Sequence, residues 1–185
     1  MKQLLLAVGI VFICIQEFKA QEFPEKENDT IIVWTESRKL TWADFQRPSH
    51  EKTRGAQSDI GLSIVSTHTN SSVNYVVFPY FYKQRSSTNS SNVHILKHEQ
   101  IHFDIAEVYA RIMRKKLNEL DNISFDKKRY EIEIDRIYSA YLKEQEDFDK
   151  ETGHSIVTEK QKIWGQKIAS ELRRLRSFKS KIFVD

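Results

Sequence analysis

The pattern of hydrophobic and polar positions changes its period once along this chain, near residue 93. Before that point, β-branched and aromatic residues gather in short runs at residues 31–34, 56–67 and 73–82. Runs of this composition, bounded by polar turn residues, are typical of β-strands. The stretch 67–72, which joins the last two runs, is made of short polar residues that favour a turn. The pattern therefore predicts one strand followed by an antiparallel hairpin.

After residue 93 the spacing becomes helical. Ile101, Ile105, Val108 and Ile112 follow one another at intervals of four, three and four, which places them on one face of a helix. Two more helices are expected over residues 125–148 and 158–178. Their predicted inner faces are Ile134, Ile137, Tyr138 and Tyr141 in one, and Ile163, Trp164, Ile168 and Leu172 in the other. Strands followed by helices indicate an α+β fold, with N-terminal antiparallel strands before three long helices.

The first twenty residues have the pattern of a secretory signal peptide. Lys2 precedes an unbroken apolar run at residues 4–15, and Ala20 ends the segment. The run is shorter than the roughly 20 apolar residues that span a bilayer, which disfavours the alternative of a retained membrane anchor. We expect an exported protein, periplasmic or extracellular, without a stable membrane span once residues 1–20 are removed. A polar, flexible leader is expected at 21–30 and a single domain at 31–185.

Composition narrows the chemistry further. The formal net charge of +3 arises from 29 basic and 26 acidic residues spread along the chain, which gives no reason to expect nucleic-acid binding. The only cysteine, Cys14, lies inside the predicted signal peptide. The mature chain can therefore offer no thiolate, and any metal site must be built from His, Asp and Glu.

One motif carries a specific chemistry. His98, Glu99 and His102 form an H-E-x-x-H pattern inside the first predicted helix. Two histidines four residues apart lie on one helical face and can bind the same ion. Glu99 lies about 100° around the helix from His98, where its carboxylate can take a proton from a metal-bound water. The motif predicts a zincin-like active-site helix with Zn²⁺ on the two histidines and Glu99 as the general base.

A catalytic zinc generally has three protein ligands, so a third must come from elsewhere in the chain. His154 is the first choice, because Gly153 is expected to end the second helix and let the chain fold back over the first. Carboxylates on the second helix are the alternative. The candidates there are Glu131, Glu133 and Asp135.

Three segments of the chain form a recognisable set: Leu40-Thr41-Trp42-Ala43-Asp44-Phe45, His98-Glu99-Gln100-Ile101-His102-Phe103-Asp104, and Thr152-Gly153-His154 with Gln161 and Trp164. Together these segments resemble a known family, number 922 of the bacterial domains of unknown function, described as secreted zinc-dependent proteases. The middle segment is the most specific. The resemblance covers nearly all of the mature chain and implies a metallopeptidase in which His154 is a functional position.

Three hypotheses for function follow. The leading one is an exported zinc-dependent hydrolase, a peptidase acting on a peptide or protein substrate, and the intact His98, Glu99 and His102 favour it. The second is a non-catalytic envelope protein that binds a peptide or protein partner through its hairpin, with or without a structural metal. The third is a charge-rich helical structural protein that needs no metal. Two histidines and a nearby glutamate suit zinc among the first-row divalent ions.

Overall fold

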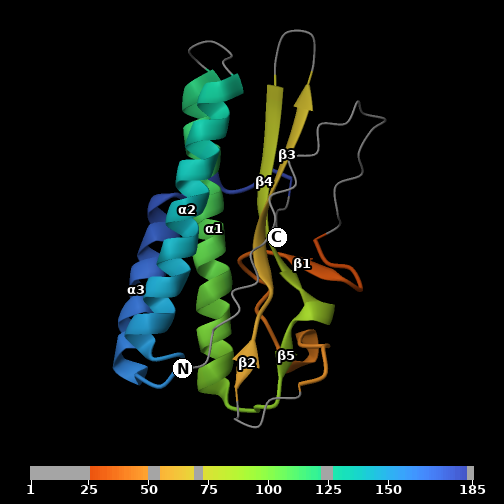
Figure 1. The fold of residues 1–185 in the computed structure, drawn as a ribbon, viewed down its shortest axis with the longest axis vertical. Coiled ribbons are helices and arrows are strands. Elements are labelled where there is room, and N and C mark those ends of the chain that lie inside the picture. The colour runs from red at the N-terminus through yellow and green to blue at the C-terminus, as the bar shows by residue number, and fades with distance from the viewer. Residues whose placement is uncertain (1–25, 50–54, 69–72, 122–126, 183–185) are drawn as a thin grey trace.

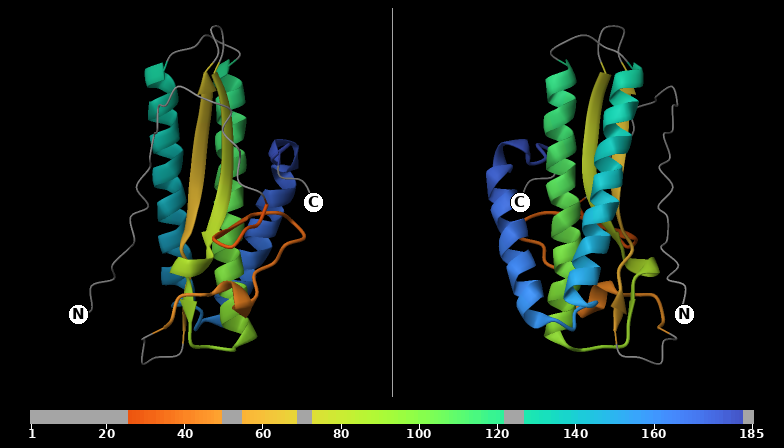
Figure 2. Two further views of the ribbon diagram at one scale, coloured as in Figure 1. Left: turned by 90° about the vertical axis from the view of Figure 1, so that its right-hand side faces the viewer. Right: turned by 60° about the vertical axis from the view of Figure 1, so that its left-hand side comes forward.

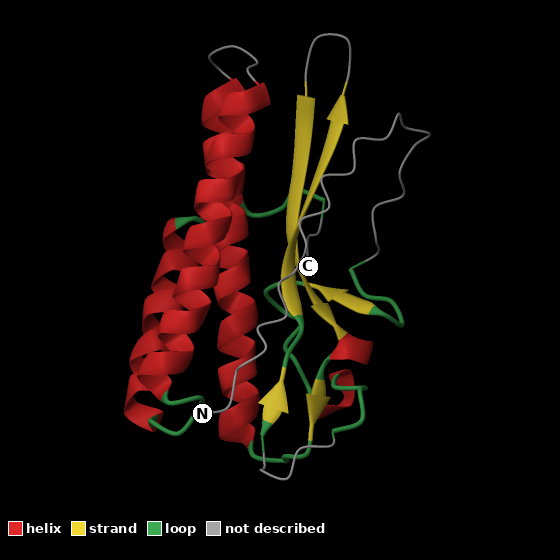
Figure 3. Ribbon diagram, in the orientation of Figure 1, coloured by secondary structure: helices red, strands yellow, loops and turns green. Residues whose placement is uncertain are grey.

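The computed structural model describes residues 26–49, 55–68, 73–121 and 127–182, and these form the expected α+β fold (Figure 1, Figure 3). Short antiparallel strands come first and three helices follow. No helix in this described part is long and apolar enough to cross a membrane. The elements are β1 (Ile31–Val33), η1 (Trp42–Asp44), β2 (Ala56–Gln57), β3 (Ile60–His68), β4 (Val73–Tyr82), η2 (Lys83–Arg85), β5 (Ser87–Thr88), α1 (Val93–Asp121), α2 (Lys127–Thr152), α3 (Thr158–Arg174) and η3 (Arg176–Phe178).

The predicted hairpin is confirmed for β3 and β4, which pair antiparallel from Ile60 opposite Phe81 to His68 opposite Val73. The strand β1 pairs with the other edge of β4, so the sheet order is β1-β4-β3. Residues 56–57 differ from the prediction: they form β2, which pairs with β5 instead of extending the hairpin. The polar segment at 84–92 contains the short strand β5. Of the predicted turn at 67–72, residues 67–68 belong to β3 and residues 69–72 lie outside the described residues.

The three helices stand side by side, and α1 packs against the hairpin, α2 and α3 (Figure 2). The Asn92 side chain caps the start of α1, since the His94 backbone N–H donates to Asn92 Oδ1 at 2.9 Å. The inner face of α3 differs from the prediction at one position. Ile163 is 51% exposed, whereas Gln161 is buried with Trp164 and Ile168. The buried positions follow the three-and-four spacing of a helix, and Ile163 falls beside that stripe.

The N-terminal segment is fastened to the sheet by a charged network. Glu27 accepts hydrogen bonds from Arg38 Nε at 2.7 Å and from Lys83 Nζ at 2.6 Å. Arg38 also donates to Asp44, the residue that closes the short turn η1 begun by Thr41. Residues 26–30, the end of the predicted flexible leader, are therefore tied to η2 by charge pairing. The predicted signal peptide at 1–20 lies outside the described residues.

A second charged network is buried within α1. Glu107 and Arg111 are 2% and 1% exposed and are joined by a 2.7 Å hydrogen bond from Arg111 Nε. Arg111 also donates to the Leu172 carbonyl of α3 at 2.6 Å. Arg114 donates to Glu107 and to the Phe178 carbonyl of η3. These arginines satisfy backbone carbonyls near the end of the chain and thereby hold that end against α1.

Candidate metal centre

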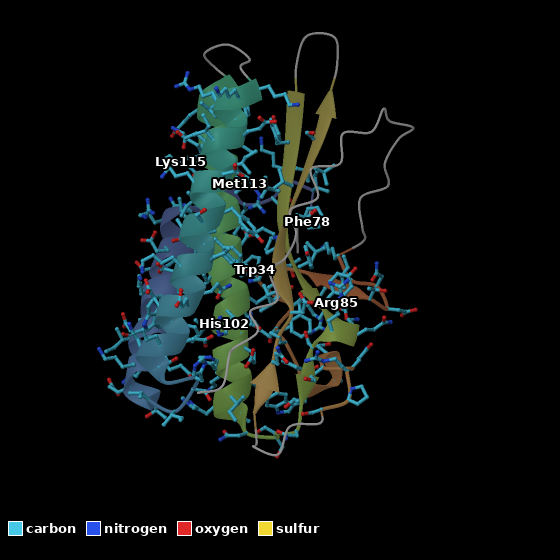
Figure 4. All side chains as sticks on the ribbon, in the orientation of Figure 1. Trp34, Phe78, Arg85, His102, Met113 and Lys115 are labelled. Atoms are coloured by element: carbon cyan, nitrogen blue, oxygen red, sulfur yellow. The ribbon has the colours of Figure 1, made fainter. Side chains whose placement is uncertain are left out.

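The first half of α1 and the last turns of α2 bring three potential ligand atoms together. Asp149 Oδ1 lies 3.0 Å from His98 Nε2 and 3.0 Å from His102 Nε2. The two Nε2 atoms are 3.1 Å apart. Figure 4 marks His102 on α1, where α2 runs alongside. All three ligand atoms lie within 4.8 Å of one another, so one ion can contact all of them.

Helical periodicity explains how each side chain reaches this point. His98 and His102 are one turn apart on α1, as the motif predicts. Asp149 continues the inner stripe of α2 that includes Tyr141 and Phe148. It comes 47 residues after His102, and it reaches the histidines because the connection between the helices turns the end of α2 back beside the start of α1.

An aromatic wall supports the two imidazoles. The Phe148 ring stacks on the His98 ring with centroids 4.4 Å apart, and it meets the His102 ring edge-on at 4.8 Å. Trp164 of α3 packs behind Phe148 at 5.4 Å. His98 is 3% exposed, and its Nδ1 has no hydrogen-bond partner among the described residues. The aromatic contacts therefore leave Nε2 as the nitrogen of His98 that meets a polar group.

The pKa values of the cluster are coupled. Burial by itself disfavours ionisation of Asp149, but the hydrogen bonds and charges of His102 and His98 outweigh it and hold the Asp149 pKa well below its ordinary value. Burial of His102 opposes its protonation, yet the hydrogen bond and charge of Asp149, with smaller effects of Glu99 and Gln145, raise the His102 pKa. Without metal the cluster therefore favours a carboxylate beside a protonated imidazole.

Glu99 lies on a different side of α1 from the three ligand atoms. Its carboxylate is 5% exposed and accepts a 2.5 Å hydrogen bond from Ser58 Oγ, in the link between β2 and β3. This contact turns Glu99 toward the sheet, whereas His98 and His102 face α2. Glu99 is thus next to His98 in the chain and outside the group of three ligand atoms.

The structure puts Asp149 in the group with His98 and His102, and it leaves His154 at the edge. His154 Nδ1 lies 3.5 Å from Asp149 Oδ1, and its side chain is 62% exposed. It sits in a turn where Gly153, His154 and Ser155 all have positive φ, at 57°, 52° and 74°. This left-handed turn ends α2 and carries His154 outward. The sequence predicted that α2 ends at Gly153, but it did not show in which direction the turn carries His154.

The three carboxylates considered as alternatives are too far along α2. Asp135 comes 14 residues before Asp149, or about 21 Å along the axis at 1.5 Å per residue, and the other two are farther. Glu131 pairs with Lys127, and Glu133 pairs with Arg136. The sequence left these three residues open as alternatives, and the structure does not group them with the two histidines. Gln145 and Asp149 were the available signal, as two polar residues on an otherwise apolar stripe.

Two other residues of the H-E-x-x-H segment have structural contacts. Asp104 Oδ1 accepts from Trp34 Nε1 at 2.7 Å and from Gln100 Nε2 at 2.9 Å. Gln100 Oε1 in turn accepts from the Leu40 backbone N–H at 2.8 Å. Burial raises the Asp104 pKa, while these donors and the charge of Lys39 oppose the rise. Gln100 and Asp104 therefore join the N-terminal segment to α1.

The donor set fits a catalytic zinc. Two imidazole nitrogens and one carboxylate oxygen are the ligand types of known zinc hydrolases, in which water completes the coordination. His98, His102 and Asp149 would hold the ion in this chain. Fold and site together define an α+β protein with a helix-borne His-His-Asp cluster and an adjacent buried glutamate.

Comparison with known proteins gives one match. Residues 82–155 match the profile of a family described as bacterial protein of unknown function (DUF922). The matched segment is less than half of the chain, but it includes α1, α2 and all three residues of the cluster, and it supports the resemblance to this family. No curated protein and no solved structure matches the chain.

Proposed function

We propose that this protein is an exported zinc-dependent hydrolase that cleaves peptide bonds. The observation that carries the proposal is the convergence of His98 Nε2, His102 Nε2 and Asp149 Oδ1. Glu99 follows His98 on the same helix, and its charge acts on His102. The signal-like residues 1–20 support export. The match to the family segment supports treating the cluster as part of a shared module, although the family description names no activity.

Different residues of the chain would carry out the different steps of hydrolysis. A bound zinc would lower the pKa of a coordinated water from about 15.7 to roughly 7 and polarise the substrate carbonyl. Glu99 would accept the proton of the attacking water and return it to the leaving amine. Ser58 would hold the Glu99 carboxylate in place through its 2.5 Å hydrogen bond. Because the metal-free cluster favours a proton on His102, zinc binding should release protons and strengthen as the pH rises.

The first test is metal content. Elemental analysis of the protein purified without chelator should find about one zinc per chain, because a catalytic zinc has three protein ligands and this cluster supplies one set. His98→Ala should hold little metal, while the matched surface change His154→Ala should keep most of it. No bound metal in the wild type, even after zinc is supplied, would refute the hydrolase and favour the partner-binding or structural hypotheses.

The second test separates catalysis from metal binding. Glu99→Gln should keep zinc and lower turnover of a fluorogenic peptide library by about 10²–10⁴, the usual contribution of a general base. The amide can still accept from Ser58, so the local fold should be kept. Glu119→Gln, an exposed change on the same helix, should retain full activity. Loss of zinc from Glu99→Gln would mean that Glu99 is a ligand and another residue is the base.

A further inference from the structure

Gln145 lies in the middle of a hydrogen-bond chain that runs from the sheet to His102. Its Nε2 donates to the His102 carbonyl at 3.0 Å, and its Oε1 lies 2.6 Å from His102 Nδ1. Gln145 also hydrogen-bonds Tyr141, whose hydroxyl donates to the Ile60 carbonyl of β3 at 3.3 Å. Three elements, β3, α2 and α1, are therefore connected through this one amide.

The donor and the acceptor can be assigned in both hydrogen bonds between Gln145 and His102. A backbone carbonyl only accepts hydrogen bonds, so the Gln145 atom facing the His102 carbonyl must be the NH₂ group. The atom facing His102 Nδ1 is then the amide oxygen, which also only accepts. His102 Nδ1 must therefore carry a hydrogen. When the imidazole is neutral it has one N–H, so its free electron pair is then on Nε2.

The neighbouring groups agree with this assignment. His98 Nδ1 has no partner in the described part of the chain, so its proton belongs on Nε2, where Asp149 Oδ1 accepts it at 3.0 Å. His102 Nε2 also lies 3.0 Å from Asp149 Oδ1, an acceptor that favours a second proton on His102 in the metal-free protein. Gln145 holds the proton on Nδ1 in either state, so the proton that a metal displaces is the one on Nε2.

We propose that Gln145 is a positioning residue that holds the His102 proton on Nδ1 and so presents Nε2 as a ligand. The proposal rests on the proposed metal site for its effect on affinity, but the orientation of His102 is a property of the metal-free protein. Partners that fix a ligating histidine in this way typically account for a 10–100-fold difference in metal affinity. Gln145 is partly buried on the face of α2 toward α1, so solvent does not replace it easily.

Two substitutions at Gln145 separate positioning from packing. Gln145→Leu removes both hydrogen-bonding functions. Gln145→Glu loses the donation to the His102 carbonyl and Tyr141, but a carboxylate still accepts from Nδ1. Both variants should unfold more easily without metal. Zinc affinity, measured by competition with a chromophoric chelator, should fall 10–100-fold in Gln145→Leu and stay within about threefold of wild type in Gln145→Glu.

Gln161 offers the matched control. It is also a buried glutamine, and its Nε2 donates to a backbone carbonyl, that of His94, at 3.0 Å. Its hydrogen-bond partner is thus on the first turn of α1, away from the ligand atoms. Gln161→Leu and Gln161→Glu should destabilise the fold and leave zinc affinity nearly unchanged. Equal losses of affinity in Gln145→Leu and Gln145→Glu would overturn the proposal, because they would assign the effect to packing alone. The proposal would also be overturned if Gln161→Glu bound zinc more tightly than Gln161→Leu by the same factor that separates Gln145→Glu from Gln145→Leu. That result would assign the recovered affinity to the added negative charge.

Nitrogen-15 NMR of His102 distinguishes this proposal from the proposed function. The Nδ1–H should be seen in metal-free wild type and in Gln145→Glu, and should exchange rapidly with solvent in Gln145→Leu. A wild-type Nδ1 without hydrogen would overturn the assignment whether or not zinc binds. An Nδ1–H that depends on Gln145 in a protein that binds no zinc would support the His102 assignment and overturn the hydrolase.

Discussion

At the scale of single residues, the most informative finding is the role of Asp149. Its carboxylate oxygen contacts both histidines at 3.0 Å, and their hydrogen bonds keep it ionised. A deprotonated carboxylate is the form that binds metal. The neighbouring acidic residue Asp147 instead points to Lys143, on the exposed side of α2. A difference of two positions on one helix thus separates a candidate ligand from a surface ion pair.

Asp149→Asn should therefore remove metal binding more completely than any surface change. We expect zinc affinity to fall by about a hundredfold or more, since even outer-shell partners of a metal contribute roughly 10–100-fold. Asp147→Asn is the matched control and should bind zinc like the wild type. Isothermal titration with zinc measures both. Retained affinity in Asp149→Asn, with a loss in His154→Ala, would restore His154 as the third ligand.

At the scale of elements, α1 performs different tasks on different faces. One face presents His98 and His102 to α2, and the next presents Glu99 to the link between β2 and β3. Another presents Asp104 to the N-terminal segment. The second half of the helix buries Glu107, which two arginines surround. Contacts therefore hold α1 on several of its faces, and the candidate ligand atoms are carried by a helix that is fixed in the fold.

Glu107→Gln tests how far that fixation depends on the buried charges. Removing one partner of a buried ion pair leaves the other charge uncompensated, which typically costs about 3–5 kcal/mol. The free energy of unfolding in urea should fall by that amount, because Arg111 has no access to water. Glu119→Gln, an exposed change on α1, should stay within about 0.5 kcal/mol of wild type. Equal stability of the two variants would mean that the network contributes little.

At the scale of the whole molecule, ion pairs attach the N-terminal segment to the rest of the fold. The helix α1 packs against the hairpin and also against α3. Glu27 is the residue on which the N-terminal attachment depends, since it meets Arg38 and Lys83 together. The hydrogen bond from Arg38, which outweighs the opposing effect of burial, lowers the Glu27 pKa to about 2 from an ordinary 4.5. This attachment should therefore be sensitive to acid.

The sign of that pH dependence follows from linkage. A carboxyl whose pKa is lowered by folding stabilises the protein fully above its unfolded pKa, and the stabilisation is lost as the pH falls through the folded value. The loss should occur between about pH 4.5 and pH 2. Glu27→Gln should remove on the order of 1 kcal/mol at neutral pH, a small value because the side chain is 36% exposed and screened.

The measurement is the midpoint of urea unfolding for wild type and Glu27→Gln across this pH range. The difference between the two should shrink as the pH falls, because protonation of the wild type removes the same interaction. Arg38→Gln should shrink the wild-type pH dependence in the same way. A constant difference down to pH 2 would contradict the role of Glu27.

Local patterns were sufficient for the elements and for half of the site. The period change near residue 93 predicted strands before helices, and the three helix ranges agree with the structure to within a few residues. The motif predicted that His98 and His102 share a face, because residues four apart on a helix are neighbours whatever surrounds them. Each of these conclusions depends on residues close together in the chain.

The remaining decisions required the tertiary structure. Eight acidic residues lie on α2, and the one local signal for Asp149, its place on the inner stripe, does not say what it meets. Its role depends on which turn of α2 comes level with His98, and therefore on the connection between the helices and the packing of Phe148. The proposed role of Gln145 depends on tertiary structure in the same way, because both of its partners, a carbonyl and an imidazole, belong to His102, 43 residues earlier. Periodicity sets which way a side chain points from its own helix, whereas only the packing of one helix on another decides what it meets.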